Sequence, residues 1–190
     1  GTSGRQTAPP SFEARYQAVF TNSRDAIGIS KAGVHVFVNP AYLQLFGYPP
    51  GTDLAGKPVL DLIAPDSRDQ IRAYILRRVR GEPVPSAYET RGLRADGSAF
   101  DMEVNVSRYR ESGEDHTLVI LRDITQRKLA ASALAHSEAN YRRLYHETPV
   151  LLHSIDREAR IVEVNDYWLG VMGYERSEVI GRKVTDFYTA

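Results

Sequence analysis

The sequence predicts an α+β fold: a five-stranded antiparallel sheet with helices on one face, followed by a linker helix and an incomplete second copy. Three observations predict it. Residues 13–62 recur at about 138–187, five segments have the apolar patterns of strands, and residues 124–146 contain no Gly or Pro. Strands joined by short turns pair antiparallel, and the helices between them must then cover the apolar face of the sheet.

The repeat is clearest in two phrases, "VFVNPAYLQLFGY" (Val36–Tyr48) and "VEVNDYWLGVMGY" (Val162–Tyr174), which match at an offset of 126. Farther along, "DLAGKPVLDL" aligns with "EVIGRKVTDF", whereas residues 63–125 have no second copy. We therefore expect a tag remnant or disordered lead-in over residues 1–10 and a complete domain over 11–125. A coupling helix over 126–146 and the amino-terminal half of a second domain over 147–190 follow.

Composition narrows the class of protein. The 190 residues are 42% hydrophobic and 25% charged, which is ordinary for a soluble globular chain. Twenty-four basic residues balance twenty-four acidic ones, which argues against nucleic-acid and anionic-membrane partners. There are no cysteines, so disulfides and thiolate metal sites are impossible. We expect a cytoplasmic location and no membrane contact by this segment, although an anchor elsewhere in a longer parent is compatible with it.

The first elements are a helix and a hairpin. Ser11–Phe20 carries apolar residues at helical spacing, namely Phe12, Tyr16, Val19 and Phe20. Ala26–Ser30 and Val34–Val38 alternate around "KAG" and predict two paired strands.

A short helix follows the hairpin. Asn39 is an N-cap residue and Pro40 suits the first helical position, while Gly47 ends the helix. Val59–Ile63 predicts one helical turn.

A longer helix begins at Ser67, with Gln70 three residues later in a capping-box pattern. Ile71, Ile75 and Val79 predict its buried face. The arginines predict a solvated face; they are Arg72, Arg77, Arg78 and Arg80.

Three strands complete the domain, over residues 87–94, 100–110 and 116–123. Apolar and polar residues alternate in the second of these, which predicts one buried face. In the third strand, "TLVILR" has apolar residues on both faces, so we expect both faces to be covered.

The linker predicts a helix that pairs with a second copy of itself. Its apolar residues fall on the a and d positions of one heptad frame: Ile124, Ala131, Leu134, Tyr141 and Tyr145. Arg127 and Glu138 interrupt this seam. We predict a homodimer, the alternative being a single solvated spacer helix.

Four motifs together resemble the PAS sensory family: "VNPAYLQLFGY", "LAGKPVLDLI", "RADGSAFDMEVNVS" and "LVILRDITQRK". The resemblance covers residues 12–125 in full and 137–190 as an amino-terminal half. It implies a pocket between the sheet and its helices, and a longer parent in which sensing controls an output domain. That output is most often a histidine kinase of a two-component system and less often a cyclic-di-GMP enzyme.

The "DIT" motif, Asp123–Thr125, predicts a signal-transmitting junction. Asp123 and Thr125 can cap the free amides of the helix that follows the last strand. The resemblance implies that this aspartate pairs with a nearby basic residue, and Arg127 is the candidate. With Ile124 between them, these residues are our predicted transmission site.

The pocket candidates are apolar and hydroxyl-bearing residues of the sheet and the longer helix, with Asn39 at one end: Ile29, Asn39, Tyr74, Tyr88, Thr90, Met102 and Val104. For the apolar members core packing is the alternative, and for Asn39 it is helix capping. We expect no bound cofactor, with a small metabolite and a non-covalent flavin as alternatives. The flavin alternative would make the protein a redox or light sensor.

The resemblance implies that haem would be bound by a histidine on the longer helix and that a flavin adduct would form on a cysteine. Residues 67–80 contain no histidine and the chain contains no cysteine, so we expect neither. No catalytic or metal-binding motif is present, so we expect no enzymatic activity from these residues and no metal site. "YHETPV" lacks the spacing of a phospho-accepting histidine box. Because it lacks three of the five strands, the second copy is expected to pack its apolar face against a neighbouring chain or the first domain, or to be poorly ordered.

Overall fold

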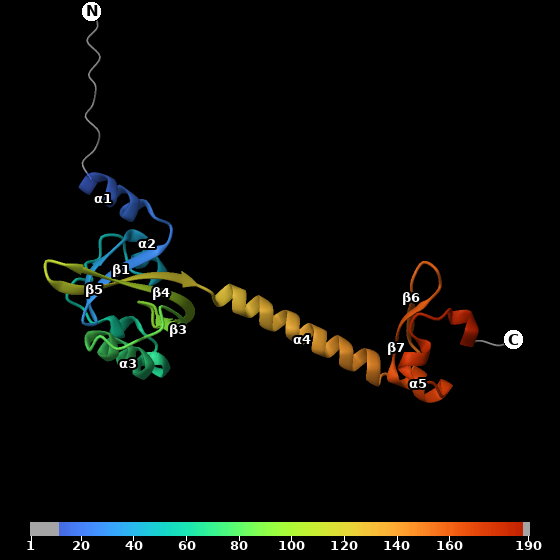
Figure 1. The fold of residues 1–190 in the computed structure, drawn as a ribbon. Coiled ribbons are helices and arrows are strands. Elements are labelled where there is room, and N and C mark those ends of the chain that lie inside the picture. The colour runs from blue at the N-terminus through green and yellow to red at the C-terminus, as the bar shows by residue number, and fades with distance from the viewer. Residues whose placement is uncertain (1–11, 188–190) are drawn as a thin grey trace, which may run out of the picture. The chain divides into compact units, whose positions relative to one another are not determined.

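The computed structural model describes residues 12–187, with side chains from residue 17 onward (Figure 1). The predicted lead-in at residues 1–10 lies outside this range. The chain divides into two compact units, Gly1–Arg127 and Lys128–Ala190, and each is described by itself. No helix in the described range is both long and apolar enough to cross a bilayer.

A five-stranded antiparallel sheet in the order β2-β1-β5-β4-β3 forms the centre of the first unit, as predicted. Two of the hairpins, β1–β2 and β4–β5, turn through two residues with positive φ, Ala32-Gly33 and Ser112-Gly113, a conformation that matches the twist of paired strands. The strands are β1 (Ala26–Lys31), β2 (Val34–Val38), β3 (Ala87–Leu93), β4 (Ala99–Glu111) and β5 (Glu114–Asp123).

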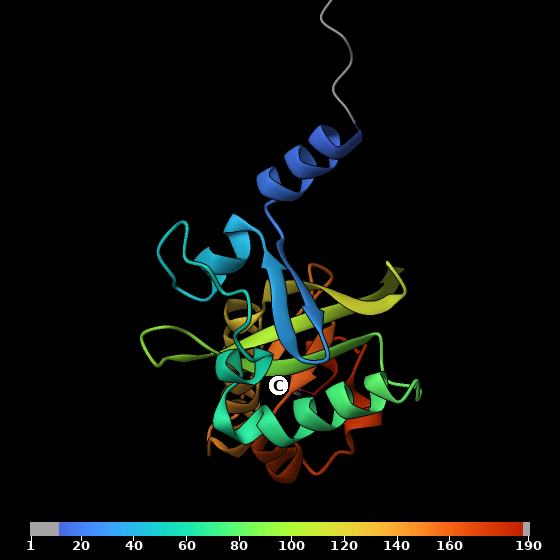
Figure 2. The ribbon, with the colours of Figure 1, turned by 90° about the vertical axis from the view of Figure 1, so that its left-hand side faces the viewer.

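Helices cover one face of this sheet (Figure 2). Tyr42 and Phe46 at α2, and Ile71 on α3, pack with Met102 and Val104 of β4 in a single core. Away from this core, Phe20 of α1 is buried and stacks near Phe37, whereas Val19 is exposed. The helices are α1 (Phe12–Asn22), α2 (Pro40–Leu45), η1 (Val59–Leu62), η2 (Pro65–Ser67) and α3 (Arg68–Val79).

The ends of α2 follow the sequence prediction. The Asn39 side chain accepts a hydrogen bond from the Tyr42 amide, and Pro40 is the first helical residue. Gly47, at φ +72°, donates to the Gln44 carbonyl and closes the helix.

The start of α3 differs from its prediction. Ser67 precedes the helix, but its hydroxyl donates to Asp66 and its side chain makes no capping hydrogen bond. The reason is conformational: Ser67 ends η2 and already has helical backbone angles, φ −104° and ψ −8°, whereas a capping residue is extended. The capping box is therefore wrong, although the helix begins where expected.

The two faces of β5 are covered only in part. Val119 and Leu121 face the core, and Leu118 and Ile120, which alternate with them, are half-buried, as Val119 is. They pair with Ile29 and Ile27 of β1 on the face opposite the helices. That apolar face stays partly open to solvent.

The linker is one continuous helix, α4 (Thr125–Glu147), and none of its residues is buried. Figure 1 shows α4 as an unbroken helix. The absence of Gly and Pro explains this continuity, because no residue interrupts the backbone hydrogen bonds.

The second unit closes its own small core, contrary to the prediction that its apolar face lacks a partner within the copy. Trp168 is fully buried and meets the ring of Phe187 edge-on, with centroids 5.6 Å apart. The turn η3 brings Phe187 into this core, at the position that Leu62 occupies in the core of the first unit. Its elements are β6 (His153–Ile155), β7 (Ile161–Val164), α5 (Asp166–Met172), α6 (Arg176–Val179) and η3 (Val184–Phe187).

Candidate functional site

A cavity of about 230 Å³ lies between α3 and the sheet of the first unit. Five of the predicted pocket residues border it: Tyr88, Thr90, Met102 and Val104, together with Ile29, which lies on β1 but pairs with Leu118 on the opposite face and is outside the core cluster. β3 and β4 place the first four on one face, because Tyr88 pairs with Val104 and Thr90 with Met102 in the antiparallel ladder. The alternation of the strands thus builds one wall of the cavity.

Asn39 lies outside the cavity lining and acts as a clamp. Its side-chain oxygen accepts from the amides of Ile27 and Tyr42, and its nitrogen donates to the carbonyls of Phe20 and Asp25. All four bonding positions of the amide are occupied, so the side chain ties α1, β1 and α2 together. Asn39 therefore caps α2, the alternative to a pocket role, and does not line the cavity.

Tyr74 also lies outside the lining. Its ring packs edge-on against Tyr88, with centroids 4.9 Å apart, and Gln70 donates to its hydroxyl at 3.2 Å. Tyr74 therefore supports Tyr88, which does line the cavity.

A buried hydrogen-bonded pair, His35 and Tyr42, is part of the cavity lining. His35 Nδ1 donates to the Lys57 carbonyl at 2.8 Å, which leaves Nε2 to accept from the Tyr42 hydroxyl at 2.9 Å. Burial lowers the pKa of His35, against the opposing effects of the Lys57 carbonyl and Asp61, and burial raises the pKa of Tyr42. The pair is thus held neutral.

The Tyr42 ring also explains a glycine. A Cβ at Gly28 would lie 2.8 Å from this ring, so β1 can approach α2 only without a side chain there.

Two polar atoms at the cavity have no hydrogen-bond partner among the described residues: the Thr90 hydroxyl and Nη2 of Arg78. Both residues line the cavity. The prediction that Arg78 belongs to a solvated face is wrong, because it is half-buried and its guanidinium lies 5.8 Å from the ring centre of Tyr88. Val79, predicted to be buried, is 63% exposed.

A junction between β5 and α4 forms at the predicted transmission residues. The Asp123 carboxylate accepts from the Thr125 amide at 2.8 Å, and the Thr125 hydroxyl accepts from the Asp101 amide at 3.0 Å. Ile124 is buried, and its amide donates to the Asp101 carbonyl. The end of β5 and the start of α4 are therefore both fastened to β4.

The predicted ion pair between Asp123 and Arg127 is wrong. Arg94 pairs with Asp123 instead, at 2.6 Å, and Arg127 pairs with Glu89 of β3 at 3.1 Å. Arg94 lies in the turn between β3 and β4, where its guanidinium stacks over Phe100 at 4.0 Å and donates to the Leu45 carbonyl. Arg127, which is close to Asp123 in sequence, pairs with the sheet instead, and Arg94, 29 positions from Asp123, pairs with its carboxylate.

Opposing influences act on Asp123. Partial burial raises its pKa, but the hydrogen bonds from Thr125 and the Arg94 charge together lower it below its ordinary value. Asp123 is therefore an anion at neutral pH, as the junction requires.

The predicted seam of α4 is open to solvent. Leu134 is 62% exposed and Tyr141 is 55% exposed, Ala131 is exposed, and Tyr145 is half-buried and stacks with Tyr141. Within the described residues, no group of three His, Asp or Glu side chains converges in a way that could hold a metal ion.

Comparison with protein families and with known proteins gives consistent matches. The model of the PAS fold matches residues 14–124, and a PAS domain model matches residues 147–190. The C4-dicarboxylate transport sensor protein DctS of Rhodobacter capsulatus is 34% identical over 103 residues, which cover 53% of this chain and 16% of that protein. Sporulation kinase A of Bacillus subtilis (strain 168) is 27% identical over 179 residues, 90% of this chain and 28% of the kinase.

The chain thus spans less than a third of either relative. Among solved structures, the PAS domain of a protein from Colwellia psychrerythraea superimposes with a TM-score of 0.52 at 23% identity. The match covers 61% of this chain and 99% of that domain, and it shows the same fold. With a five-stranded PAS architecture and a family match over more than half of its length, this chain belongs to the PAS family.

Proposed function

We propose that this chain is the sensory region of a two-component histidine kinase, in which the first PAS domain relays a signal through α4 to an output kinase domain. The alignment with a kinase along 90% of the chain supports this output. In this proposal the chain itself catalyses no reaction and works in the cytoplasm.

One observation carries the proposal: the strands that line the cavity also hold the start of α4. Leu121 lines the cavity and Asp123 lies two residues beyond it on β5; Met102 lines the cavity next to Asp101, which bonds Ile124. A ligand that shifts β4 against β5 therefore changes the backbone positions on which α4 begins. Strand movement reaches the helix through a short, hydrogen-bonded junction.

The cavity favours a small metabolite over a flavin. A protein cavity of about 150 Å³ accommodates benzene, so the 230 Å³ cavity suits a ligand of about ten non-hydrogen atoms. The three fused rings of a flavin need considerably more room.

The proposed active form is a homodimer. Two apolar surfaces support it: the exposed a and d residues of α4, such as Leu134 and Tyr141, and the half-buried Leu118 and Ile120 on the uncovered sheet face. Burying apolar surfaces of this kind between two copies stabilises association.

The test is a substitution at the junction in the full-length kinase. Asp123→Ala removes the ion pair with Arg94 and the cap on Thr125, so we expect autophosphorylation that no longer responds to the signal. Asp69→Ala is the control, because this carboxylate is exposed on α3. Autophosphorylation that follows the signal equally in both variants would contradict the proposed relay.

A further inference from the structure

We propose, building on the ligand-sensing function above, that the cavity binds a small carboxylate whose charged end is held by Arg78 and whose second polar group is held by Thr90. Neither contact is implied by the fold, because both depend on particular side chains of α3 and β3. Arg78 and Thr90 lie on opposite walls of the cavity, one on the helix and one on the sheet.

Arg78 is directed to the cavity by the helical repeat. It follows Ile71 by seven residues and Ile75 by three, which places it on the same face of α3 as these two lining residues. Its guanidinium is held near the rings of Tyr74 and Tyr88, at 5.9 and 5.8 Å from their centres. Nη2 is buried, and no described residue accepts from it. A fixed guanidinium with an unused donor is suited to a carboxylate.

Thr90 supplies the second contact. It is 7% exposed, its hydroxyl is buried, and no described residue bonds that hydroxyl. Val104 and Met102, which surround it on the sheet, are apolar and cannot satisfy it. Buried hydroxyls in native proteins are nearly always bonded, and a polar ligand atom at this position would satisfy the Thr90 hydroxyl.

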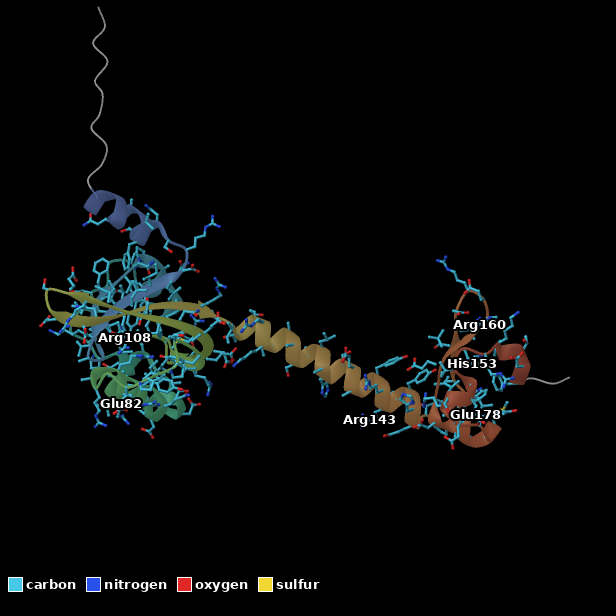
Figure 3. The ribbon with its side chains drawn as sticks, in the orientation of Figure 1. Glu82, Arg108, Arg143, His153, Arg160 and Glu178 are labelled. Carbon is cyan, nitrogen blue, oxygen red and sulfur yellow. The ribbon has the colours of Figure 1, made fainter. Side chains whose placement is uncertain are left out.

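The charges around the cavity leave Arg78 free for an anion. Asp115 lines the cavity but pairs with Arg110, and Lys31 pairs with Glu114. Glu82, which follows α3, lines a second pocket together with Arg78 and Arg108 of β4; Glu82 and Arg108 are labelled in Figure 3.

Glu82, however, forms its ion pairs with Arg77 and Arg80. Arg108 adds a second positive charge to the cavity lining. The cavity lining thus includes two arginines, Arg78, which is half-buried, and Arg108, which is exposed.

The remaining surface of the cavity specifies the body of the ligand. Ile71, Ile75, Met102 and Val104 make it apolar, and its volume of about 230 Å³ limits its length. A carboxylate of about five to seven carbons with a carbonyl or hydroxyl group several atoms from the acid satisfies both polar contacts in this space.

Three compounds of nearly equal size test the inference by isothermal titration on the whole chain: hexanoate, hexanamide and 5-oxohexanoate. We expect hexanoate to bind at least about tenfold more tightly than the uncharged hexanamide, because only the acid forms a charge-assisted contact. Arg78→Met should abolish this preference while retaining hexanamide binding, which shows that the variant folds. Arg80→Met is the matched control and should keep the preference, since Arg80 is exposed at the end of the same helix.

Thr90→Val tests the second contact with an isosteric change. We expect 5-oxohexanoate to bind about fivefold more tightly than hexanoate, and this gain to vanish in Thr90→Val. Equal binding of acid and amide, or an acid preference that survives Arg78→Met, would overturn the carboxylate assignment and leave the signal relay, which is tested at Asp123, untouched. Binding of none of the three compounds would overturn it as well, by showing that the cavity does not admit ligands of this class.

Discussion

Asn39 and Asn165 lie 126 positions apart and make the same four side-chain hydrogen bonds, one set in each copy of the repeat. In both copies the oxygen accepts from one amide in or just before the strand, that of Ile27 or Leu152, and from one amide in the first turn of the helix, while the nitrogen donates to two carbonyls before the strand. Both residues are fully buried. The repeated phrase is thus a repeated structural clamp.

Loss of the clamp should destabilise each unit separately. Asn165→Ala removes a helix cap and leaves buried backbone groups without partners, so we expect the unfolding free energy of the second unit to fall by about 3 kcal/mol. Trp168, the single tryptophan of the chain, is buried in that unit, so denaturation followed by its fluorescence reports this change. Asn39→Ala should leave the tryptophan transition in place and shift the transition seen by circular dichroism. Equal shifts of the tryptophan transition in both variants would contradict two separate units.

Stability should depend on the protonation of His35. Because burial lowers its pKa, the folded state holds His35 neutral, whereas the unfolded chain binds a proton below pH about 6.5. The unfolded state then binds more protons, so unfolding free energy falls as pH drops from about 6.5 toward the lowered pKa. His35→Gln should flatten this dependence in urea denaturation between pH 7 and pH 5, while His136→Gln, on exposed α4, should retain it. A slope that is unchanged in His35→Gln would show that other groups cause it.

The ion pair between Arg94 and Asp123 should contribute a measurable coupling. For a pair that is partly exposed, a double-mutant cycle of Arg94→Met and Asp123→Asn should give about 1 kcal/mol at pH 7. Because the pKa of folded Asp123 lies below its ordinary value of about 3.9, this contribution is present above that value and disappears as pH falls through the lowered pKa. A coupling that persists in strong acid would mean that charge is not its source.

Dimerisation should depend on the a and d positions of α4. Leu134→Glu places a charge in the predicted seam, so we expect the dimer dissociation constant to rise at least about tenfold in light scattering or sedimentation. Ala133→Glu is the matched control, because Ala133 is exposed on the outer side of the heptad frame, and it should leave the constant unchanged. A wild-type chain that stays monomeric, or equal effects of the two substitutions, would contradict the paired linker.

Local signals predicted the fold well, because each was carried by neighbouring residues. The positions of the strands followed from alternation, the ends of α2 from Asn39 and Gly47, and α4 from its uninterrupted helix formers. Where these predictions were wrong, tertiary structure decided. Ser67 belongs to the preceding helical turn and therefore does not cap α3, and Phe187 packs against Trp168 within the second copy.

The site was predicted less completely, since its contacts join distant residues. Arg94 meets Asp123 across 29 positions and no local pattern distinguishes it from Arg127, which is nearer in sequence. The His35–Tyr42 hydrogen bond likewise depends on how β2 faces α2. The position of Arg78 at the cavity could have been predicted, because its seven-residue spacing from Ile71 places it on the buried face of α3. It was assigned to the solvated face because arginine is charged.

The central claim, that events in the cavity reach α4 through Asp123, is tested most directly by hydrogen exchange at the first turn of α4. The amides of this turn are measured with and without a cavity ligand, in the wild type and in Asp123→Ala, after titration has shown that both bind it. We predict that the ligand changes exchange at Thr125–Lys128 in the wild type and leaves it unchanged in Asp123→Ala. A ligand-dependent change of equal size in both proteins, or none in the wild type at full occupancy, would contradict the relay.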